Sequence, residues 1–417
     1  MIRGLRIIDG GFLDAESSAV LAARLGVSSR HMNRLFRAEL GATPRTLAMT
    51  RRRGLAKRLI DETDLPLAAV ALQAGYGSLR RFNDDVRRCY GRPPGVLRAR
   101  RRGRRSPRRV TADAYYSLRL PVRAPYHADW VFEFLARRAL AGFETVSGRC
   151  YRRRVFDADG SEHWIEVRWD GDALHLDVPL ACTVPLSDIL RRVRRVFDLD
   201  ADPRAIDAAL GDDPLLAEVV REHGGLRVPG AWDGFETTVR AILGQQVSVD
   251  RATVLAHKLL DRYGAHCLTS PAALADAVPA EIGMPGRRGQ AISLLAAAVA
   301  DGRLQLDDAA PAADLQAALC AIPGIGPWTA GYVAMRVAKD PDAFPVNDWV
   351  VLKVLQSALG EAAALSAARA AAAGRPGSRA DGWRPWRAYA VMYLWKLSQS
   401  VRAAERRPAP PRATEAR

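Results

Sequence analysis

The chain has 417 residues and carries 62 Lys and Arg against 46 Asp and Glu, which gives a formal net charge of +16. This length predicts roughly two to four domains, and the excess of positive charge favours a polyanionic partner. No apolar run reaches the ~18–20 residues that span a bilayer, and the N-terminus has no signal-peptide core, so we expect no membrane contact and a cytoplasmic location.

Residues 15–40 have the pattern of a helix-turn-helix unit. A leading helix around 17–24 ends at Leu25-Gly26-Val27, where glycine suits a left-handed turn, and Ser28 is a good N-cap for the next helix. That helix has one apolar face and one face of short polar and arginine side chains, as a reader of the DNA major groove requires. The apolar face comprises Met32, Leu35, Phe36 and Leu40, and the polar face comprises Ser29, Arg30, Asn33, Arg34 and Arg37.

The same pattern returns at residues 66–97. An apolar run leads into Gly75-Tyr76-Gly77, after which Ser78 can cap a further helix. The apolar run comprises Leu67, Val70, Ala71 and Leu72, and the side chains of the later helix expected to be buried are Leu79, Phe82 and Val86. Two such units joined by a helix near 51–61 resemble the AraC-type DNA-binding domain of transcription regulators, and G-R-P-P-G-V-L-R at 91–98 matches its C-terminal half. The resemblance implies such a domain over residues 1–97; the alternative is an ordinary helical bundle with basic faces.

The second reading helix carries both basic and acidic side chains. Arg80 and Arg81 are its candidates for DNA contact, but Asp84 and Asp85 follow on the same helix. Because acidic groups near phosphates are repulsive, we expect this unit to bind weakly or only to position the first. No cysteine precedes Cys89 and no methyl-accepting P-C-H-R-like site is present, so methyl transfer is not an expected activity.

Residues 98–111 form an arginine-rich linker in this reading. Residues 98–109 hold eight arginines, which repel one another and favour an extended chain. The run is either a solvated tether or a further set of sequence-independent phosphate contacts.

Alternating apolar residues begin at about Tyr115. The runs S-L-R-L-P-V, W-I-E-V-R-W and A-L-H-L-D-V predict strands, with Asp170-Gly171-Asp172 as a hairpin turn between the last two. With helices expected at 129–140 and 187–197, they indicate a small antiparallel α+β domain over residues 112–200. Residues 201–402 are rich in Ala and Leu and read as helical, and residues 403–417 as a disordered tail.

A tight turn, Pro323-Gly324-Ile325-Gly326, separates two apolar helical segments in the C-terminal part. Gly324 and Gly326 can take positive φ and have no Cβ, so a phosphate can approach the backbone N–H groups. A helix that begins near Pro327 directs its N-terminus to the same place. Such a hairpin suits a grip on the DNA backbone without sequence readout. Downstream, Asp348 is a lone carboxylate between Asn347 and Trp349.

Together with nearby aromatic residues, this segment resembles the helix-hairpin-helix DNA glycosylase superfamily, and most closely its alkylated-base (3-methyladenine DNA glycosylase II) branch. The resemblance covers roughly residues 112–400 and is also carried by F-E-T-T-V-R-A-I-L-G-Q-Q-V-S-V, I-G-M-P-G-R-R and R-P-W-R-A-Y-A. It implies a multidomain, mainly α chain: two helix-turn-helix units, a small antiparallel α+β domain as a structural flank, and an all-α helix-hairpin-helix glycosylase domain over 201–402.

The resemblance also implies roles for single residues. Asp348 matches the carboxylate that stabilises an oxocarbenium-like sugar or orients water, whereas Asp340 and Asp342 are rivals by proximity alone. Gln246 matches the side chain inserted into the duplex, and would otherwise be a helix C-cap amide. Electron-rich rings attract a cationic alkylated base. The expected base pocket is Trp328, Tyr332, Trp386 and Tyr389, and the expected backbone contacts are Pro323, Gly324, Ile325, Gly326 and Thr329.

Relatives that also cleave the DNA backbone use a lysine just after the hairpin as a Schiff-base nucleophile. Trp328 stands at that position and neither Lys339 nor Lys353 matches it, so we expect a monofunctional enzyme that leaves an abasic site. A monovalent cation on the hairpin carbonyls is implied by the resemblance only. No zinc site is expected, because the cysteines lie far apart in the sequence: Cys89, Cys150, Cys182, Cys267 and Cys320. No iron–sulfur cluster is expected either, because relatives with a cluster carry four cysteines near the C-terminus and this chain has none after Cys320.

The leading hypothesis is a glycosylase that removes purines of the 3-methyladenine and 7-methylguanine type from double-stranded DNA. We expect it to act as a monomer at the nucleoid, with an AraC-like DNA-binding module. The alternative is a transcription regulator of the alkylation response whose glycosylase half mainly binds DNA. Excision of oxidised purines is less favoured, because such relatives use the missing lysine.

Overall fold

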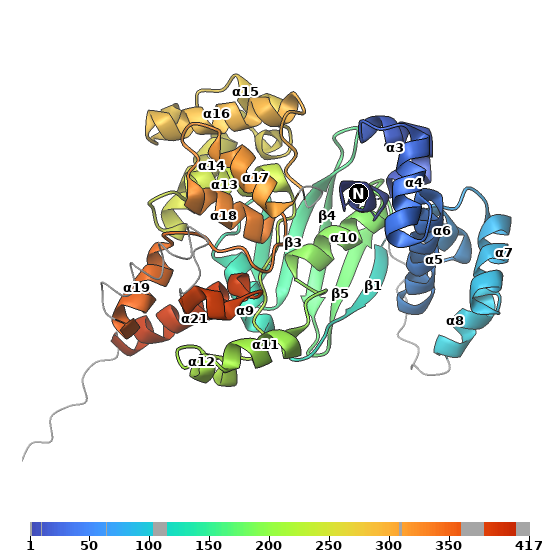
Figure 1. The fold of residues 1–417 in the computed structure, drawn as a ribbon, viewed down its shortest axis with the longest axis horizontal. Helices are drawn as coiled ribbons and strands as arrows, with labels where there is room; N and C mark the ends of the chain where they lie inside the picture. Colours follow the sequence, from blue (N-terminus) through green and yellow to red (C-terminus); the bar gives the residue numbers. More distant parts are fainter. Residues whose placement is uncertain are drawn as a thin grey trace, which may run out of the picture.

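The computed structural model describes residues 2–9, 11–63, 65–102, 115–307, 311–359 and 379–405. Its described part is mainly helical and is arranged around a central antiparallel sheet (Figure 1). The N-terminal helices lie on one side of this sheet and most of the C-terminal helices lie on the other. The predicted fold class, mainly α with one small antiparallel sheet, is confirmed.

The first helix-turn-helix unit folds as the sequence predicts. It consists of α1 (Ile2–Asp9), α2 (Phe12–Ala15), α3 (Ser18–Arg24) and α4 (Ser29–Leu40). Ser28 caps α4, since its Oγ accepts a hydrogen bond from the His31 backbone N–H at 3.2 Å. Met32 and Phe36 of the predicted apolar face are buried in a small apolar core, whereas Leu40 of the same face is exposed at the last turn of α4.

The second unit repeats this arrangement around one long helix. It consists of α5 (Pro44–Glu62), α6 (Leu67–Gln73), α7 (Leu79–Tyr90) and α8 (Pro94–Arg102). Ser78 caps α7 through its side-chain oxygen, and Phe82 and Val86 are fully buried as predicted. Leu79 was expected to be buried but is 45% exposed, and Leu72 of the preceding apolar run is 72% exposed, so the corner between α6 and α7 faces outward.

Of the two acidic residues of α7, one is buried and the other is exposed to solvent. Asp85 is buried and accepts hydrogen bonds from the Arg53 guanidinium at 2.6 and 2.9 Å and from the Tyr76 hydroxyl at 2.8 Å. Asp84 is exposed. The expectation that both carboxylates repel phosphates is therefore wrong for Asp85, which ties α7 to α5 instead.

We expect Asp85→Ala to destabilise the N-terminal unit by about 2 kcal/mol, because it leaves the Arg53 guanidinium and the Tyr76 hydroxyl without their acceptor. The hydrogen bond from Arg53 lowers the pKa of Asp85 below its ordinary value of 3.8. The stabilisation is thus fully present above about pH 4 and is lost as the pH falls through the lowered pKa. Urea unfolding of wild type and variant at pH 7 and pH 3 measures both effects. Asp84→Ala is the control, and equal losses in the two variants would contradict the assignment.

The central sheet has five antiparallel strands in the order β1-β5-β4-β3-β2. The strands are β1 (Tyr115–Pro121), β2 (Glu144–Ser147), β3 (Cys150–Phe156), β4 (Glu162–Trp169) and β5 (Ala173–Pro179). Asp170 shapes the predicted β4–β5 turn, since its carboxylate accepts the backbone N–H groups of Asp172 and Ala173. The sequence did not predict β2 and β3, because the three successive arginines of β3 hide its alternation.

The middle of these arginines forms a buried ion network. Arg153 points into the core, where its guanidinium contacts the carboxylates of Glu144 on β2 and Glu236 on α13 (Gly234–Leu243). Arg240 completes the network, with its Nη1 at 2.8 Å from an oxygen of each carboxylate. Two positive and two negative charges therefore balance inside the molecule, and they join the sheet to the helical part.

Helices α9 (Ala128–Ala136) and α10 (Leu186–Val196) pack against the sheet near the positions predicted for them. The C-terminal part follows with α11 (Pro203–Gly211), α12 (Ala217–Glu222), α13 (Gly234–Leu243), α14 (Val249–Tyr263), η1 (Ala265–Leu268), α15 (Ala272–Ala275), η2 (Pro279–Ile282), α16 (Gly286–Ala300), α17 (Ala312–Cys320), α18 (Pro327–Arg336), α19 (Trp349–Leu359), η3 (Arg379–Trp383) and α21 (Arg387–Glu405). Within the described ranges, no helix is long and apolar enough to cross a membrane.

The second helix-turn-helix unit packs directly on the sheet. Thr63, at the end of α5, forms a β-bridge with Leu118 of β1, and the Gln73 side chain accepts the backbone N–H of Leu186 at 3.0 Å. The buried apolar residues of this unit belong to the same contiguous cluster as those of the sheet and the C-terminal helices. The second helix-turn-helix unit, the sheet and the C-terminal helices therefore share one core.

The predicted linker differs from the structure at its start. Residues 98–102 belong to α8, and Arg98 is buried, with its guanidinium donating to the Leu65 carbonyl. Residues 103–111 lie outside the described residues. The predicted tail begins inside α21, which runs to Glu405, and residues 406–417 also lie outside the description.

Candidate active site

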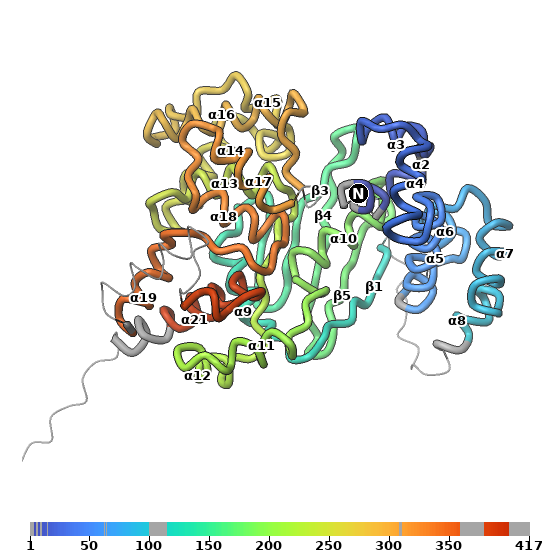
Figure 2. Tube along the Cα trace, in the orientation of Figure 1, coloured from blue at the N-terminus to red at the C-terminus, as the bar shows by residue number. Residues whose placement is uncertain are grey.

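The predicted hairpin joins α17 to α18, and α18 packs beside α13 (Figure 2). Gly324 takes φ +92°, and a Cβ there would meet the Ala291 side chain at 2.9 Å and the Arg287 carbonyl at 3.0 Å, so this position requires glycine. Gly326 has an ordinary φ of −100° and is the N-cap of α18, so the expectation of positive φ is wrong for this residue. Pro327 opens α18 as predicted.

A cleft of about 1310 Å³ opens beside the hairpin. Its wall includes the ends of α9 and α13, the first turns of α16, α18 and α19, and one face of α21. Gly324, Ile325, Gly326 and Thr329 line it together with Asp348 and Gln246, whereas Pro323 lies on the exposed side of the turn. The hairpin, the insertion candidate and the candidate carboxylate therefore share one cavity.

Asp348 is buried at the N-terminus of α19 and is held by four N–H donors. Its Oδ1 accepts the backbone N–H groups of Val350 and Val351 at 3.1 and 3.0 Å, which is the contact of a helix N-cap. The indole N–H of Trp395 also reaches Oδ1 at 3.1 Å, and that of Trp328 reaches Oδ2 at 3.0 Å. A carboxylate with four fixed donors has a defined orientation toward the cleft. Asn347 is exposed, and the donors come from other residues.

Trp328 and Tyr332 form the aromatic wall beside this carboxylate. Their rings stack with centroids 5.5 Å apart and planes within 18°. Burial raises the pKa of Tyr332, but the positive charges of Arg336 and Arg138 and a hydrogen bond from Arg336 at 2.6 Å outweigh it and leave the pKa below its ordinary value. The guanidinium of Arg336 also donates to the backbone carbonyls of Pro229 and Gly230, so it holds the Tyr332 hydroxyl in a fixed position.

The other two residues predicted for the base pocket do not line the cleft. The Tyr389 hydroxyl donates to Asp198 at 3.0 Å inside the core, and Trp386 packs edge-on against Tyr389. Trp395 of the same helix faces the cleft instead. The sequence had no local signal that Trp395 of α21, and not Trp386 just before that helix, would face the cleft.

Gln246 follows the end of α13 and is exposed at the cleft with φ +54°. Its neighbour Gln245, which the sequence did not single out, turns the other way. The Gln245 side-chain amide donates to the Gly324 carbonyl and to the Thr329 Oγ1, both at 3.0 Å. Trp349 also borders the cleft and is 65% exposed, with the Lys353 ammonium 5.7 Å from its ring centroid.

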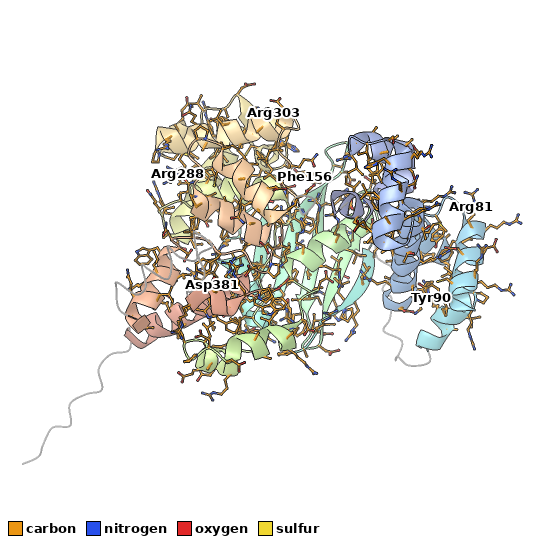
Figure 3. The ribbon with its side chains drawn as sticks, in the orientation of Figure 1. Arg81, Tyr90, Phe156, Arg288, Arg303 and Asp381 are labelled. Atoms are coloured by element: carbon orange, nitrogen blue, oxygen red, sulfur yellow. The ribbon has the colours of Figure 1, made fainter. Side chains whose placement is uncertain are left out.

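The predicted reading faces of α4 and α7 contain exposed arginines. Arg30, Arg34, Arg80 and Arg81 are exposed, whereas Ser29 and Asn33 are half-buried and the Asn33 amide donates to the Ser29 carbonyl at 2.9 Å. Figure 3 places Arg81 on α7 and Arg288, at the rim of the cleft, on opposite sides of the molecule.

The Lys339 ion pair and the cluster of Asp157, His163 and Cys182 have structural contacts outside the cleft. Lys339 is paired with Asp198 at 2.6 Å, away from the cleft. Asp157, His163 and Cys182 are the described residues whose metal-ligand atoms lie within 4.8 Å of one another. The Asp157 carboxylate accepts hydrogen bonds from His163, at 2.8 Å, and from two backbone N–H groups. It thereby ties the β3–β4 hairpin to the segment before α10.

Comparison with known families places two domains on this chain. The family model described as "AlkA N-terminal domain" matches residues 117–233, and the one described as "Helix-turn-helix domain" matches residues 21–100. The first match covers the sheet and its flanking helices, and the second covers most of α3 to α8.

Three relatives extend the comparison. A Mycobacterium tuberculosis protein named "Probable bifunctional transcriptional activator/DNA repair enzyme AlkA" is 38% identical over 412 residues, which is 94% of this chain and 79% of the relative. Escherichia coli "DNA-3-methyladenine glycosylase 2" is 31% identical over 285 residues, 65% of this chain and 94% of the relative. The solved 3-methyladenine DNA-glycosylase from Archaeoglobus fulgidus has a TM-score of 0.55 at 19% identity, covering 67% of this chain and 98% of that chain, which shows a shared fold.

Proposed function

Because the chain belongs to the AlkA family of DNA-3-methyladenine glycosylases, in the form that carries an AraC-type helix-turn-helix domain, we propose that it excises alkylated purines from double-stranded DNA. The observation that carries the proposal is the meeting of the hairpin, the buried Asp348 carboxylate and the Trp328–Tyr332 stack in one cleft. A carboxylate, an aromatic wall and a backbone grip are the parts that base excision requires.

The proposed reaction begins with the duplex on the hairpin. The first-turn N–H groups of α18 bind a phosphate, and Gln246 enters the space of a base that has left the stack. The flipped base lies against Trp328 and Tyr332, whose ring faces attract a cationic alkylated purine by ~0.5–2 kcal/mol. Alkylation at N3 or N7 weakens the glycosidic bond, since the base leaves as a neutral molecule.

Asp348 then acts on the sugar. As the bond breaks, C1′ becomes oxocarbenium-like, and a fixed carboxylate stabilises that charge or orients the water that attacks it. Trp328 occupies the place where lyase relatives carry a lysine, so the product is an abasic site in an uncut strand. The helix-turn-helix units supply a second DNA contact through Ser29, Arg30, Asn33, Arg34, Arg80 and Arg81, and support a role in regulating transcription.

Release of base from methylated duplex DNA tests this proposal. We expect the full-length protein to liberate 3-methyladenine and 7-methylguanine and to leave strands that break only after alkaline treatment. Borohydride should trap no covalent adduct. Tight DNA binding without base release would instead favour a regulator whose glycosylase half only binds DNA, and strand cleavage with a trapped adduct would overturn the monofunctional assignment.

A further inference from the structure

One side chain links the two elements that we assign to the DNA duplex. Gln245 belongs to the short connection between α13 and α14, next to the insertion candidate Gln246. Its Nε2 donates to the carbonyl of Gly324, in the hairpin, and to Oγ1 of Thr329, in the first turn of α18, both at 3.0 Å. An amide nitrogen has two hydrogens, so these contacts use its full donor capacity.

Both acceptors, the Gly324 carbonyl and the Thr329 hydroxyl, belong to closely packed residues. Thr329 is buried within α18, and Gly324 is fixed by the close approach of Ala291 and Arg287. The connection itself is short, because α13 ends at Leu243 and the Ser248 side chain caps α14. Motion of the connection relative to the hairpin therefore requires both Gln245 hydrogen bonds to break.

The residue held by this link has a backbone conformation that is uncommon for a side chain of its kind. Gln246 has φ +54°, in the left-handed region that glutamine rarely adopts, and such a conformation persists only where its surroundings impose it. Gln245 faces the hairpin while Gln246 faces the open cleft. The direction of the exposed Gln246 side chain thus depends on the anchoring of the half-buried Gln245 side chain.

We propose that Gln245 is a positioning residue that sets the place of Gln246 relative to the hairpin, so that the backbone grip and the insertion into the duplex act as one unit. This inference rests on the proposed function and deepens it. Gln245 acts through Gln246, and it touches neither the base nor the sugar. Its loss is expected to weaken base flipping while the affinity for undamaged duplex stays nearly constant.

A double-mutant cycle with Gln245→Leu and Gln246→Gly tests the inference. Leucine lacks both donors but keeps much of the volume, and glycine tolerates the left-handed backbone at 246. We expect Gln245→Leu to reduce single-turnover excision from duplex DNA by about tenfold or more. In the Gln246→Gly background the same substitution should change the rate by less than about twofold, since the side chain that it positions is gone.

Two further readouts separate positioning from general damage. Fluorescence of 2-aminopurine beside the target reports flipping, and it should fall in Gln245→Leu even though the anisotropy-measured affinity for undamaged duplex and the melting temperature match wild type. Thr238→Val is the matched control, because this buried hydroxyl donates to the Gly234 carbonyl of its own helix and does not line the cleft.

The possible results are distinct. Equal losses from Gln245→Leu in both backgrounds, or no loss in the wild-type background, would overturn the inference. A wild-type protein that flips 2-aminopurine but releases no base would refute the proposed function, and the fluorescence cycle would still decide the role of Gln245.

Discussion

Asp348→Asn is expected to reduce single-turnover release of 3-methyladenine by roughly 10²–10³-fold, because it removes the negative charge opposite the developing oxocarbenium ion. Asparagine is as good an N-cap as aspartate, so its Oδ1 can still accept the two backbone N–H groups, although its amide nitrogen cannot accept the Trp328 indole N–H as Oδ2 does now. The variant should therefore fold, bind duplex DNA with wild-type affinity and fail in the chemical step. Quenched-flow measurement of free base, with DNA affinity measured in parallel, checks this result.

The control for this substitution is Asp340→Asn, at one of the two rival carboxylates suggested by the sequence. Asp340 accepts the backbone N–H of Asp342 at 3.0 Å and does not line the cleft. Its variant should keep the excision rate within about twofold. If both variants lose the same activity, or if Asp348→Asn releases base at the wild-type rate, Asp348 loses its assigned role.

Glu236→Gln is expected to lower the free energy of unfolding by about 3–5 kcal/mol, because it leaves two buried guanidinium groups with a single carboxylate. Glutamine keeps the shape of the side chain, so the loss reports charge and hydrogen bonding, with no cavity created. Arg153 lies 5.0 Å from the ring centroid of Trp232, one of nine tryptophans, and tryptophan fluorescence in a urea titration measures the unfolding of the chain.

An exposed pair provides the matched control for the buried network. Glu162 contacts Arg154 at 3.1 Å on the surface of the same sheet, and its carboxylate is 44% exposed. Glu162→Gln should cost less than about 1 kcal/mol, since water screens this pair. Equal losses from the two substitutions would show that the buried network contributes no more than a surface ion pair.

Local signals in the sequence were sufficient for much of this architecture. Ser28 and Ser78 cap the helices predicted for them, and Pro327 opens α18 directly after the hairpin. The Asp170 turn also lies where the strand alternation placed it. Each of these features depends on contacts within a few residues of the chain, so one sequence specifies them.

Predictions that depended on tertiary contacts were less successful. Asp85 was predicted on an exposed face of α7, but it is buried because it pairs with Arg53, which lies 32 positions earlier in the chain. Strand β3 was missed because Arg153 occupies a buried position in it. The charge of this arginine is neutralised by carboxylates of other elements, which the local sequence does not reveal. Trp386 was predicted for the base pocket and Trp395 was not singled out, since a helical pattern alone does not say which aromatic face meets the cleft. In each case the missing information was a partner distant in sequence.

The contact of Thr63 with Leu118 and of Gln73 with Leu186 also bears on how damage is surveyed. A binding module on a loose tether raises the local concentration of its partner over every site within reach of the tether. Here α7 belongs to a unit that shares its core with the sheet, so a duplex bound on α7 would meet the cleft at one offset and one angle. Lesions would then reach the cleft only at a fixed distance along the DNA from the bound site. The rotation of the double helix over that distance would decide which of them face the cleft.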